Sequence, residues 1–438
     1  SVAVSAADSR GQVATAYSNY GSYIDICAPG TSVVSTIPND SDRILNGTSM
    51  AAPVVAGVAA LIKSLHPEYS AEQLIDHLCN YAIDKGEPGF DAYYGYGLVN
   101  AYAALLQDQG SINMFGPNFT GTGSLADPYL IGTADQLIAA RSLINMGYAG
   151  FASANYRLTA DIDLSDYAAW TPIGMVYVID AEPYFTGIFD GNGYAISGMR
   201  ISVPAYYQAV NEAFGFIAIN QGKIRNLELA DATVLVDGFP SAYTGGVAGI
   251  NSAGGTIIGC SISDFVASSG QNTGGIAGSN RGSTSGCVNR ATVRGGTQTG
   301  GIAGKSTTTN ISIIDCANLG TIQGDLDTCG GIVGYNNSTI RLCRNSGIVS
   351  GAALRIGGIA GYNQYQIQTS YSNGFLSGSS ECIGGIVGYH ANNLIRNCYN
   401  TGSLDGQGQY AGGIAGISTG GQIQNCYNTG LISGSAAS

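Results

Sequence analysis

Residues 384–406 read GGIVGYHANNLIRNCYNTGSLDG, and residues 412–434 read GGIAGISTGGQIQNCYNTGLISG. Each segment has a glycine pair, a short stretch rich in β-branched residues, an Asn-Cys-Tyr-Asn group and a closing turn. The glycine pair recurs through the second half of the chain, starting at residues 245, 274, 300, 330, 357, 384 and 412. The steps are 26 to 30 residues long, a period that is typical of stacked supersecondary units.

This repeat predicts a parallel β-solenoid with one coil per copy. The strands are short, lie between Gly and Asn turns, and show no intervening helical periodicity. Phe214-Gly215 resembles a degenerate first copy, so we expect about eight coils, or a rod of about 40 Å at the usual strand spacing. The expected apolar ladder inside the rod contains Val247, Ile276, Ile302, Ile332, Ile359, Ile386 and Ile414.

Most of the ten cysteines occupy one position of the repeat. The series is Cys260, Cys287, Cys316, Cys343, Cys398 and Cys426, with Ser370 in one copy. A position that accepts serine does not require a disulfide, so we expect a ladder of small, buried free thiols. Neighbouring coils are close enough for a disulfide, which stays open as an alternative.

Composition narrows the classes of function. Charged residues make up 11% of the chain, hydrophobic residues 45%, and 66 residues are glycine, which favours a folded repeat protein over a disordered chain. The net charge is −12 and the 17 basic residues are scattered, so we expect no nucleic-acid partner. No run of 18 apolar residues occurs, so we expect no membrane span. No signal peptide is visible, but the chain starts without methionine and ends inside a repeat, so we expect both ends to be cut.

The pattern changes along the chain and predicts four regions. Residues 1–108 read as α/β, 109–125 as a linker, 126–200 as an irregular leader that forms the first irregular coils and the cap of the solenoid, and 201–438 as the repeats. The first region shows strands over 1–6 and 23–30 and a helix over 50–65. This helix is apolar on most sides, so we expect it to be buried. A capping box at 70–73 opens a second helix, and a third helix follows Gly97. Residues 133–146 predict another helix, capped by Thr133 and Gln136, that covers the open end of the coils.

The segment NGTSMAAPVVAG, residues 46–57, places a serine at the predicted start of the buried helix. Free backbone N–H groups and the positive end of the helix dipole meet there, so an anionic oxygen would be stabilised. Gly47 permits a tight turn, and Pro53 is tolerated in the first turn of a helix. The pattern favours Ser49 as a nucleophile, provided that a base removes its proton.

Residues 47–53, GTSMAAP, resemble the nucleophile motif of the subtilisin-like serine proteases, the subtilases. VAVSAAD, YSNYG, IDICAPG, HPEYSAEQL and GYGLVNAYAAL follow the family's order, and the resemblance covers about residues 1–106. It implies the C-terminal part of such a domain, a Ser-His-Asp triad with Ser49 as nucleophile, and an oxyanion site formed by the Ser49 N–H and an asparagine. In the family's order the Asp, His and Asn precede the serine, so we expect them upstream of Ser1. We expect the chain alone to be inactive.

The three histidines of the chain do not supply the base. His66 lies at the far end of the predicted helix, about 24 Å from Ser49. His77 lies opposite the Leu74/Leu78 face and is expected to be solvated. His390 occupies a repeat position that elsewhere holds Asn or Ser, which indicates a turn or stacking residue.

The repeats resemble GLUG-motif repeats, and the segment before them resembles the leader that often precedes such repeats. This resemblance implies an extracellular or cell-surface stalk or binding region without chemistry of its own. A calcium site would need carboxylate ligands, and the candidates are Asp161, Asp163 and Asp190. These residues fit a strand and a turn instead, so we expect no cofactor. Tyr335, Tyr362 and Tyr389 recur at one position, and either an exposed track for a glycan or packing between coils explains them.

Two hypotheses of function follow. The first is a secreted or surface-attached serine endopeptidase that cleaves polypeptides through an acyl-enzyme on Ser49, with the solenoid as a stalk or binding region. The second is a non-enzymatic extracellular adhesion or glycan-binding protein in which the protease-like segment is a relic.

Overall fold

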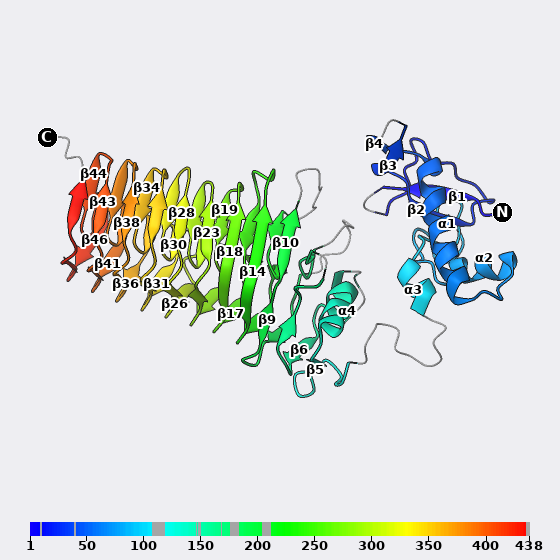
Figure 1. Ribbon diagram of the computed structural model, residues 1–438, viewed down its shortest axis with the longest axis horizontal. Coiled ribbons are helices and arrows are strands. Elements are labelled where there is room, and N and C mark those ends of the chain that lie inside the picture. The colour runs from blue at the N-terminus through cyan, green and yellow to red at the C-terminus, as the bar shows by residue number, and fades with distance from the viewer. Residues whose placement is uncertain are drawn as a thin grey trace. The chain divides into compact units, whose positions relative to one another are not determined.

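A computed structural model describes residues 1–8, 11–38, 41–106, 119–145, 147, 150–167, 169–175, 184–203 and 212–434. These residues form two compact units, of which the first extends to Leu106 and the second begins at Phe119 (Figure 1). Residues 109–118 of the expected linker lie outside the described residues. The remainder of that linker belongs to the second unit, where Thr120 forms a β-bridge with Leu130.

The first unit is a small α/β arrangement. Its strands are β1 (Val4–Ala7), β2 (Ile26–Pro29), β3 (Val33–Ile37) and β4 (Ser41–Leu45), and its helices are α1 (Thr48–Leu65), α2 (Ala71–Asn80) and α3 (Ala101–Leu106). β1 and β2 pair in parallel, whereas β3 and β4 form an antiparallel hairpin. The predicted elements are present, including the capping box of Ser70 and Gln73 at the start of α2. The β3–β4 hairpin was not predicted.

α1 buries one stripe of side chains, Ala51, Val55, Val58 and Ile62, in a core shared with β1 and β2. The expectation that α1 is buried on most sides is wrong for the described residues, because Leu61 and Leu65 are 51% and 49% exposed. The sheet beneath α1 has only two strands and covers one side of the helix.

The expected absence of a membrane span remains a prediction. Among the described helices, α1 has the length and apolar composition of a membrane span. The core helix of an ordinary domain meets the same criterion, and the buried stripe of α1 against β1 and β2 fits that interpretation.

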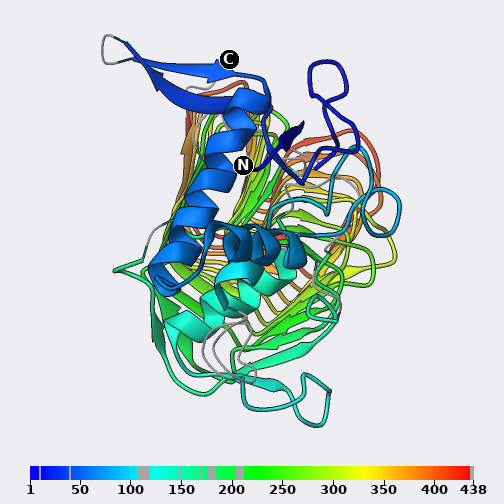
Figure 2. The same cartoon turned by 90° about the vertical axis from the view of Figure 1, so that its right-hand side faces the viewer.

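The second unit is a parallel β-solenoid, as the repeat predicts (Figure 1). One coil consists of β39 (Cys382–Gly384), β40 (Val387–His390), β41 (Leu394–Arg396), β42 (Tyr399–Asn400) and β43 (Leu404–Gly406). Each strand pairs in register with its counterpart in the next coil, for example Tyr399 with Tyr427. Viewed along the solenoid axis, the coils nest behind one another (Figure 2).

The stack of coils is longer than expected. Two of its sheets have eight strands each, from β11 (Ala213–Phe214) to β44 (Tyr410–Gly412) and from β12 (Ile217–Asn220) to β45 (Ala415–Ser418). A third sheet, which ends at β46 (Gln422–Gln424), has eleven strands among the described residues. The leader supplies its three extra strands, β5 (Tyr129–Ile131), β6 (Asn155–Leu158) and β8 (Ile188–Asp190). The expected irregular leader therefore includes true coils.

The leader also provides the helix predicted over residues 133–146. α4 (Ala134–Asn145) begins after Thr133, whose hydroxyl accepts a hydrogen bond from the Gln136 N–H at 3.3 Å. Leu137, Ala140 and Ile144 of α4 are buried in the same core as the first strands of the solenoid. α4 lies at the N-terminal end of the stack, beside β6 and β9 (Ala195–Ser197) (Figure 1).

The glycine pair allows close contact between coils. A Cβ added to Gly384 would collide with the Val387 carbonyl oxygen and lie 2.6 Å from the backbone nitrogen of Gly416 in the next coil. A Cβ added to Gly385 would collide with the Gly413 carbonyl oxygen of the next coil and lie 2.7 Å from the Cβ of the buried Asn400. Both glycines thus permit backbone contacts between coils, and the second also leaves room for a buried asparagine.

The interior contains the expected apolar ladder. Its members from Val247 to Ile386 are fully buried, and Ile414 is partly buried. The cysteine series is confirmed as a set of free thiols, buried except for the half-buried Cys426. Ser370 replaces a thiol by accepting a hydrogen bond from the Cys343 N–H at 3.1 Å and donating to the Gln368 carbonyl at 2.9 Å.

Two ladders of buried amides run beside the apolar one. The first contains Asn220, Asn251, Asn280, Ser306, Asn336, Asn363 and His390, and the second contains Asn289, Asn318, Asn345, Ser372 and Asn400. Where asparagines follow one another, the Nδ2 of one donates to the Oδ1 of the next, as from Asn251 to Asn280 at 2.8 Å. These bonds satisfy polar groups that would otherwise be costly to bury.

Replacing His390 by asparagine should reduce the pH dependence of stability. Asn363 Nδ2 donates to His390 Nδ1 at 3.2 Å, and burial lowers the pKa of His390. His390 therefore binds a proton more readily in the unfolded chain than in the folded one. Neutral His390 contributes fully to the free energy of unfolding above the usual histidine pKa of about 6.5, and this contribution is lost as the pH falls below that value. Urea denaturation at pH 7.5 and pH 5 should show a larger loss for the wild type than for His390→Asn. Equal losses would contradict the prediction.

Candidate functional site

The loop before α1 is fixed by backbone contacts with the end of β2. The Gly30 N–H donates to Ala7 O at 2.8 Å, and the Gly47 N–H donates to Gly30 O at 2.7 Å. A Cβ at Gly30 would lie 2.6 Å from the Ala6 Cβ, so only glycine allows this approach. Gly47 has φ 150°, a conformation that favours glycine. Both glycines position the residue that opens the helix.

Ser49 lies in the first turn of α1 and is exposed. No hydrogen bond to its hydroxyl is found among the described residues. α1 has no side-chain cap and no acidic residue in its first turn, so nothing there offsets the positive end of the helix dipole. The geometry expected of an accessible oxygen at a helix start is therefore present.

The loop contains a second positioning residue that the sequence reasoning did not assign. Asn46 Oδ1 accepts a hydrogen bond from the Ser32 N–H at 2.6 Å. This bond ties the end of β4 to the start of the β3–β4 hairpin, directly before Gly47. Asn46 directly precedes the serine motif at residues 47–53, and this position was the one sign in the sequence that it helps to place Ser49.

No histidine of the first unit lies beside Ser49 among the described residues. His66 follows the opposite end of α1, where its Nδ1 lies 3.3 Å from Glu68 Oε1. The expectation that His77 is solvated is wrong, because it is 7% exposed and its Nε2 lies 2.6 Å from Ala104 O. α3 packs over that side of α2, and helix periodicity alone does not show this contact. Neither histidine can take the proton of Ser49.

The aspartates considered for calcium have protein partners. Asp161 accepts from the Ala195 N–H at 2.9 Å, and Asp163 accepts from the Ser165 N–H at 2.8 Å, which lowers the Asp163 pKa. Asp190 is buried beside Arg225, with the Arg225 Nη2 2.8 Å from its Oδ2. Within the described residues, no group of three His, Cys, Asp or Glu side chains is arranged to hold a metal ion.

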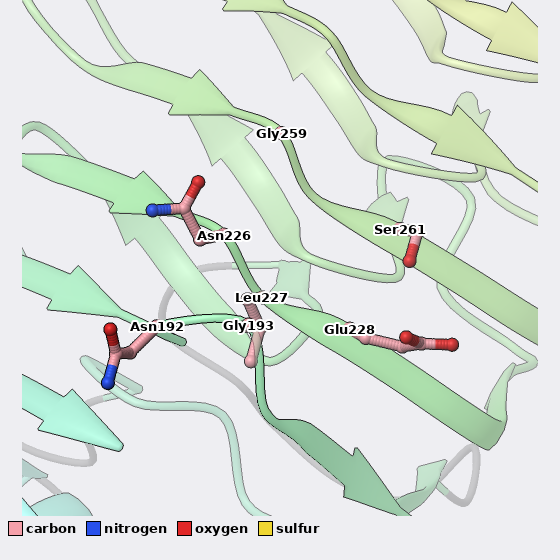
Figure 3. A pocket seen from close by; sticks show the side chains of 7 residues that line it. All are labelled: Asn192, Gly193, Asn226, Leu227, Glu228, Gly259 and Ser261. Carbon is pink, nitrogen blue, oxygen red and sulfur yellow. The ribbon is translucent and has the colours of Figure 1, made fainter. Parts of the chain in front are cut away.

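A hollow of about 470 Å³ lies where three successive coils turn, after β8, β13 (Lys223–Arg225) and β17 (Thr256–Ile258) (Figure 3). Its lining residues are Asn192, Gly193, Asn226, Leu227, Glu228, Gly259 and Ser261. Glu228 is the one carboxylate among them, and no histidine or cysteine accompanies it. Glu228 pairs in register with Ser261 of the next coil, and no hydrogen bond between their side chains is found among the described residues.

The tyrosine series at 335, 362 and 389 is closely packed. Successive ring centroids are 5.1 and 5.3 Å apart and the rings are nearly parallel, so neighbouring rings cover each other's faces. Lys305 lies over the Tyr335 ring. The hydroxyls bond to Gln364 and Thr419. These contacts favour packing between coils over a track for sugar rings.

Comparison with known proteins finds separate matches in the two units. Residues 1–97 match the subtilase family, and residues 379–404 and 407–433 match the GLUG motif. Alkaline elastase YaB of Bacillus sp. (strain YaB) and Subtilisin Savinase of Lederbergia lenta are each 48% identical over 103 residues, which is 24% of this chain. The chain spans 26% and 37% of these relatives.

Among solved structures, a candidate immunoglobulin A1 protease from Bacteroides ovatus is 21% identical, with a TM-score of 0.48, over 69% of this chain and 86% of that one. The sequence matches are local and separate, one in each unit. Residues 1–97 are similar to the subtilases, and the last coils of the solenoid are similar to the GLUG motif.

Proposed function

We propose that the first unit is part of a serine endopeptidase in which Ser49 is the nucleophile. The observation that carries this proposal is the exposed Ser49 at the uncapped start of α1, within a segment that matches the subtilases. A base removes the hydroxyl proton, the Ser49 oxygen attacks the peptide carbonyl, and the amine leaves to give an acyl-enzyme, which water hydrolyses. The backbone N–H of Ser49 helps to stabilise the oxyanion. The substrate is a polypeptide, and we place the protein outside the cell or on its surface.

The base and the oxyanion asparagine are not found beside Ser49 among the described residues, so we propose that further residues of the domain supply them. The exposed side of α1, with Leu61 and Leu65, is an apolar surface for those residues to cover. The 438-residue chain by itself should then show no appreciable proteolysis.

A fluorophosphonate probe tests the role of Ser49. The probe should label Ser49 in the full-length gene product, and Ser49→Ala should abolish the labelling. Ser64→Ala is the matched control, because Ser64 is an exposed serine on the same helix with its hydroxyl bonded to Leu61 O. Labelling of the 438-residue chain alone should be at least about 10³-fold slower, because the base is missing. Absence of labelling in the full-length product would refute the proposal.

A second function, attachment through the solenoid, is favoured by the architecture of the second unit. The solenoid has its own continuous core and a helix at its N-terminal end, and it presents long flat faces. We propose that these faces bind an extracellular ligand. If Ser49 proves inert in the full-length product, attachment remains as the function and the protease segment is a relic.

A further inference from the structure

A second series of tyrosines lies on a different face of the solenoid. Tyr371, Tyr399 and Tyr427 stand in register on β37 (Tyr371–Ser372), β42 and β47 (Tyr427–Asn428). Their ring centroids are 4.9 and 5.2 Å apart, and the rings are within 6° of parallel. The rings therefore stack face to face along the solenoid axis, one per coil, so that their edges face outward.

This series differs from the one at 335, 362 and 389 in its hydroxyl groups. No hydrogen-bond partner is found for the Tyr371, Tyr399 or Tyr427 hydroxyl within the part of the chain that the structure describes. The rings of Tyr371 and Tyr399 are partly exposed, and Tyr427 is 54% exposed. A phenol hydroxyl both donates and accepts hydrogen bonds, so this face presents a row of open groups at the spacing of the coils.

Two rows of exposed polar side chains flank the hydroxyls. One row is Thr369, Asn397 and Asn425, and the other is Asn373, Thr401 and Thr429. None of these side chains is charged. Charged side chains border these rows: Arg344 pairs in register with Tyr371 one coil earlier, Arg396 donates to Gln368 at 3.4 Å, and Asp405 accepts from Gln407 at 2.8 Å. We name this face, the three tyrosines with their two flanking rows, the tyrosine track.

We propose that the tyrosine track binds a neutral, extended polysaccharide that runs along the solenoid axis. The side chains of the tyrosine track are themselves uncharged, and the net charge of −12 of the chain repels a polyanion. A pyranose ring in an extended β-linked chain advances by a length comparable to the strand spacing of about 4.8 Å, so successive sugars can meet successive hydroxyls. Because the ring faces are covered by stacking, recognition uses hydrogen bonds from the ring edges.

This inference rests on the second function proposed above and names its ligand class. It is independent of Ser49, so its failure and that of the peptidase proposal are distinguishable. The probe experiment reports only on the first unit, and the binding experiment below reports only on the solenoid.

Depletion of the 438-residue chain from solution by insoluble cellulose, chitin and β-1,3-glucan tests the proposal, with polygalacturonate as the charged comparison. At least one neutral polymer should bind with a dissociation constant below about 1 mM, and polygalacturonate should bind more weakly. Failure of all neutral polymers, or preference for polygalacturonate, would overturn the proposal.

Matched variants locate the binding face. Tyr399→Phe removes only the hydroxyl of the central ring in the tyrosine track and should weaken binding about 3- to 10-fold. Tyr362→Phe makes the same change at the centre of the other series, where the hydroxyl accepts from Gln364 Nε2 at 3.4 Å, and should change binding less than about twofold. Both variants keep the stacked ring, and circular dichroism checks that they fold. Equal effects of the two variants would overturn the assignment to the tyrosine track.

Discussion

Gly384→Val is expected to lower the free energy of unfolding by about 3 kcal/mol or more. The new Cβ would collide with the Val387 carbonyl and lie 2.6 Å from the Gly416 nitrogen, and both of these are backbone groups held by interstrand pairing. Neither group can rotate away as a side chain would, so the coil must distort between β39 and β40 and also move away from the next coil. Urea denaturation followed by far-ultraviolet circular dichroism measures the loss.

Gly254→Ala is the matched control for this effect. Gly254 lies at a turn with φ 85°, and no atom lies within 4 Å of an added Cβ. This variant should lose only about 1 kcal/mol, the usual cost of a positive φ for a residue with a side chain. If Gly384→Val lowers the free energy of unfolding no more than Gly254→Ala does, the backbone of the coils can move to accommodate the side chain, and the prediction is wrong.

Asn345→Ala is expected to lower stability by about 2–4 kcal/mol. Asn345 is fully buried, accepts from Asn318 Nδ2 at 2.7 Å, and donates to the Gly347 carbonyl at 3.2 Å and to the Ser372 hydroxyl at 3.3 Å. Alanine leaves these partners without water to replace the lost bonds. Hydrogen exchange of the two neighbouring coils should rise with the global loss, because each coil contacts mainly its neighbours.

Asn345→Ser is the control for the amide ladder, since Ser372 occupies the same position one coil later. Its hydroxyl keeps part of the bonding, so it should cost less than half as much as alanine. If alanine is tolerated within about 0.5 kcal/mol, the ladder contributes little to stability and the prediction is wrong.

Much of the solenoid could be predicted because each coil repeats the same local constraints. The glycine pair, the apolar ladder and the cysteine series were found by aligning the chain with itself, and these positions are buried as expected. The number of coils was underestimated, because β5, β6 and β8 of the leader join the stack without carrying the glycine pair. Their pairing depends on contacts between segments that share no sequence pattern.

For the candidate site, the motif around Ser49 predicted a serine at a helix start, and the structure places it there, exposed. The motif did not show that Gly30 and Asn46 hold the preceding loop. Those contacts join residues that are 17 and 14 positions apart along the chain. Such pairings depend on the path of the β3–β4 hairpin, which the sequence reasoning missed.

The sequence by itself determined the period of the coils, the apolar and cysteine ladders inside them and the identity of the serine at the start of α1. Each of these follows from local spacing and residue type. Only the tertiary structure decided that His77 is buried under α3, that α1 packs on one side, and that one tyrosine series has bonded hydroxyls while the other has open ones. The physical reason is that burial and hydrogen bonding depend on which neighbour lies across the contact, and residue type alone does not specify that neighbour.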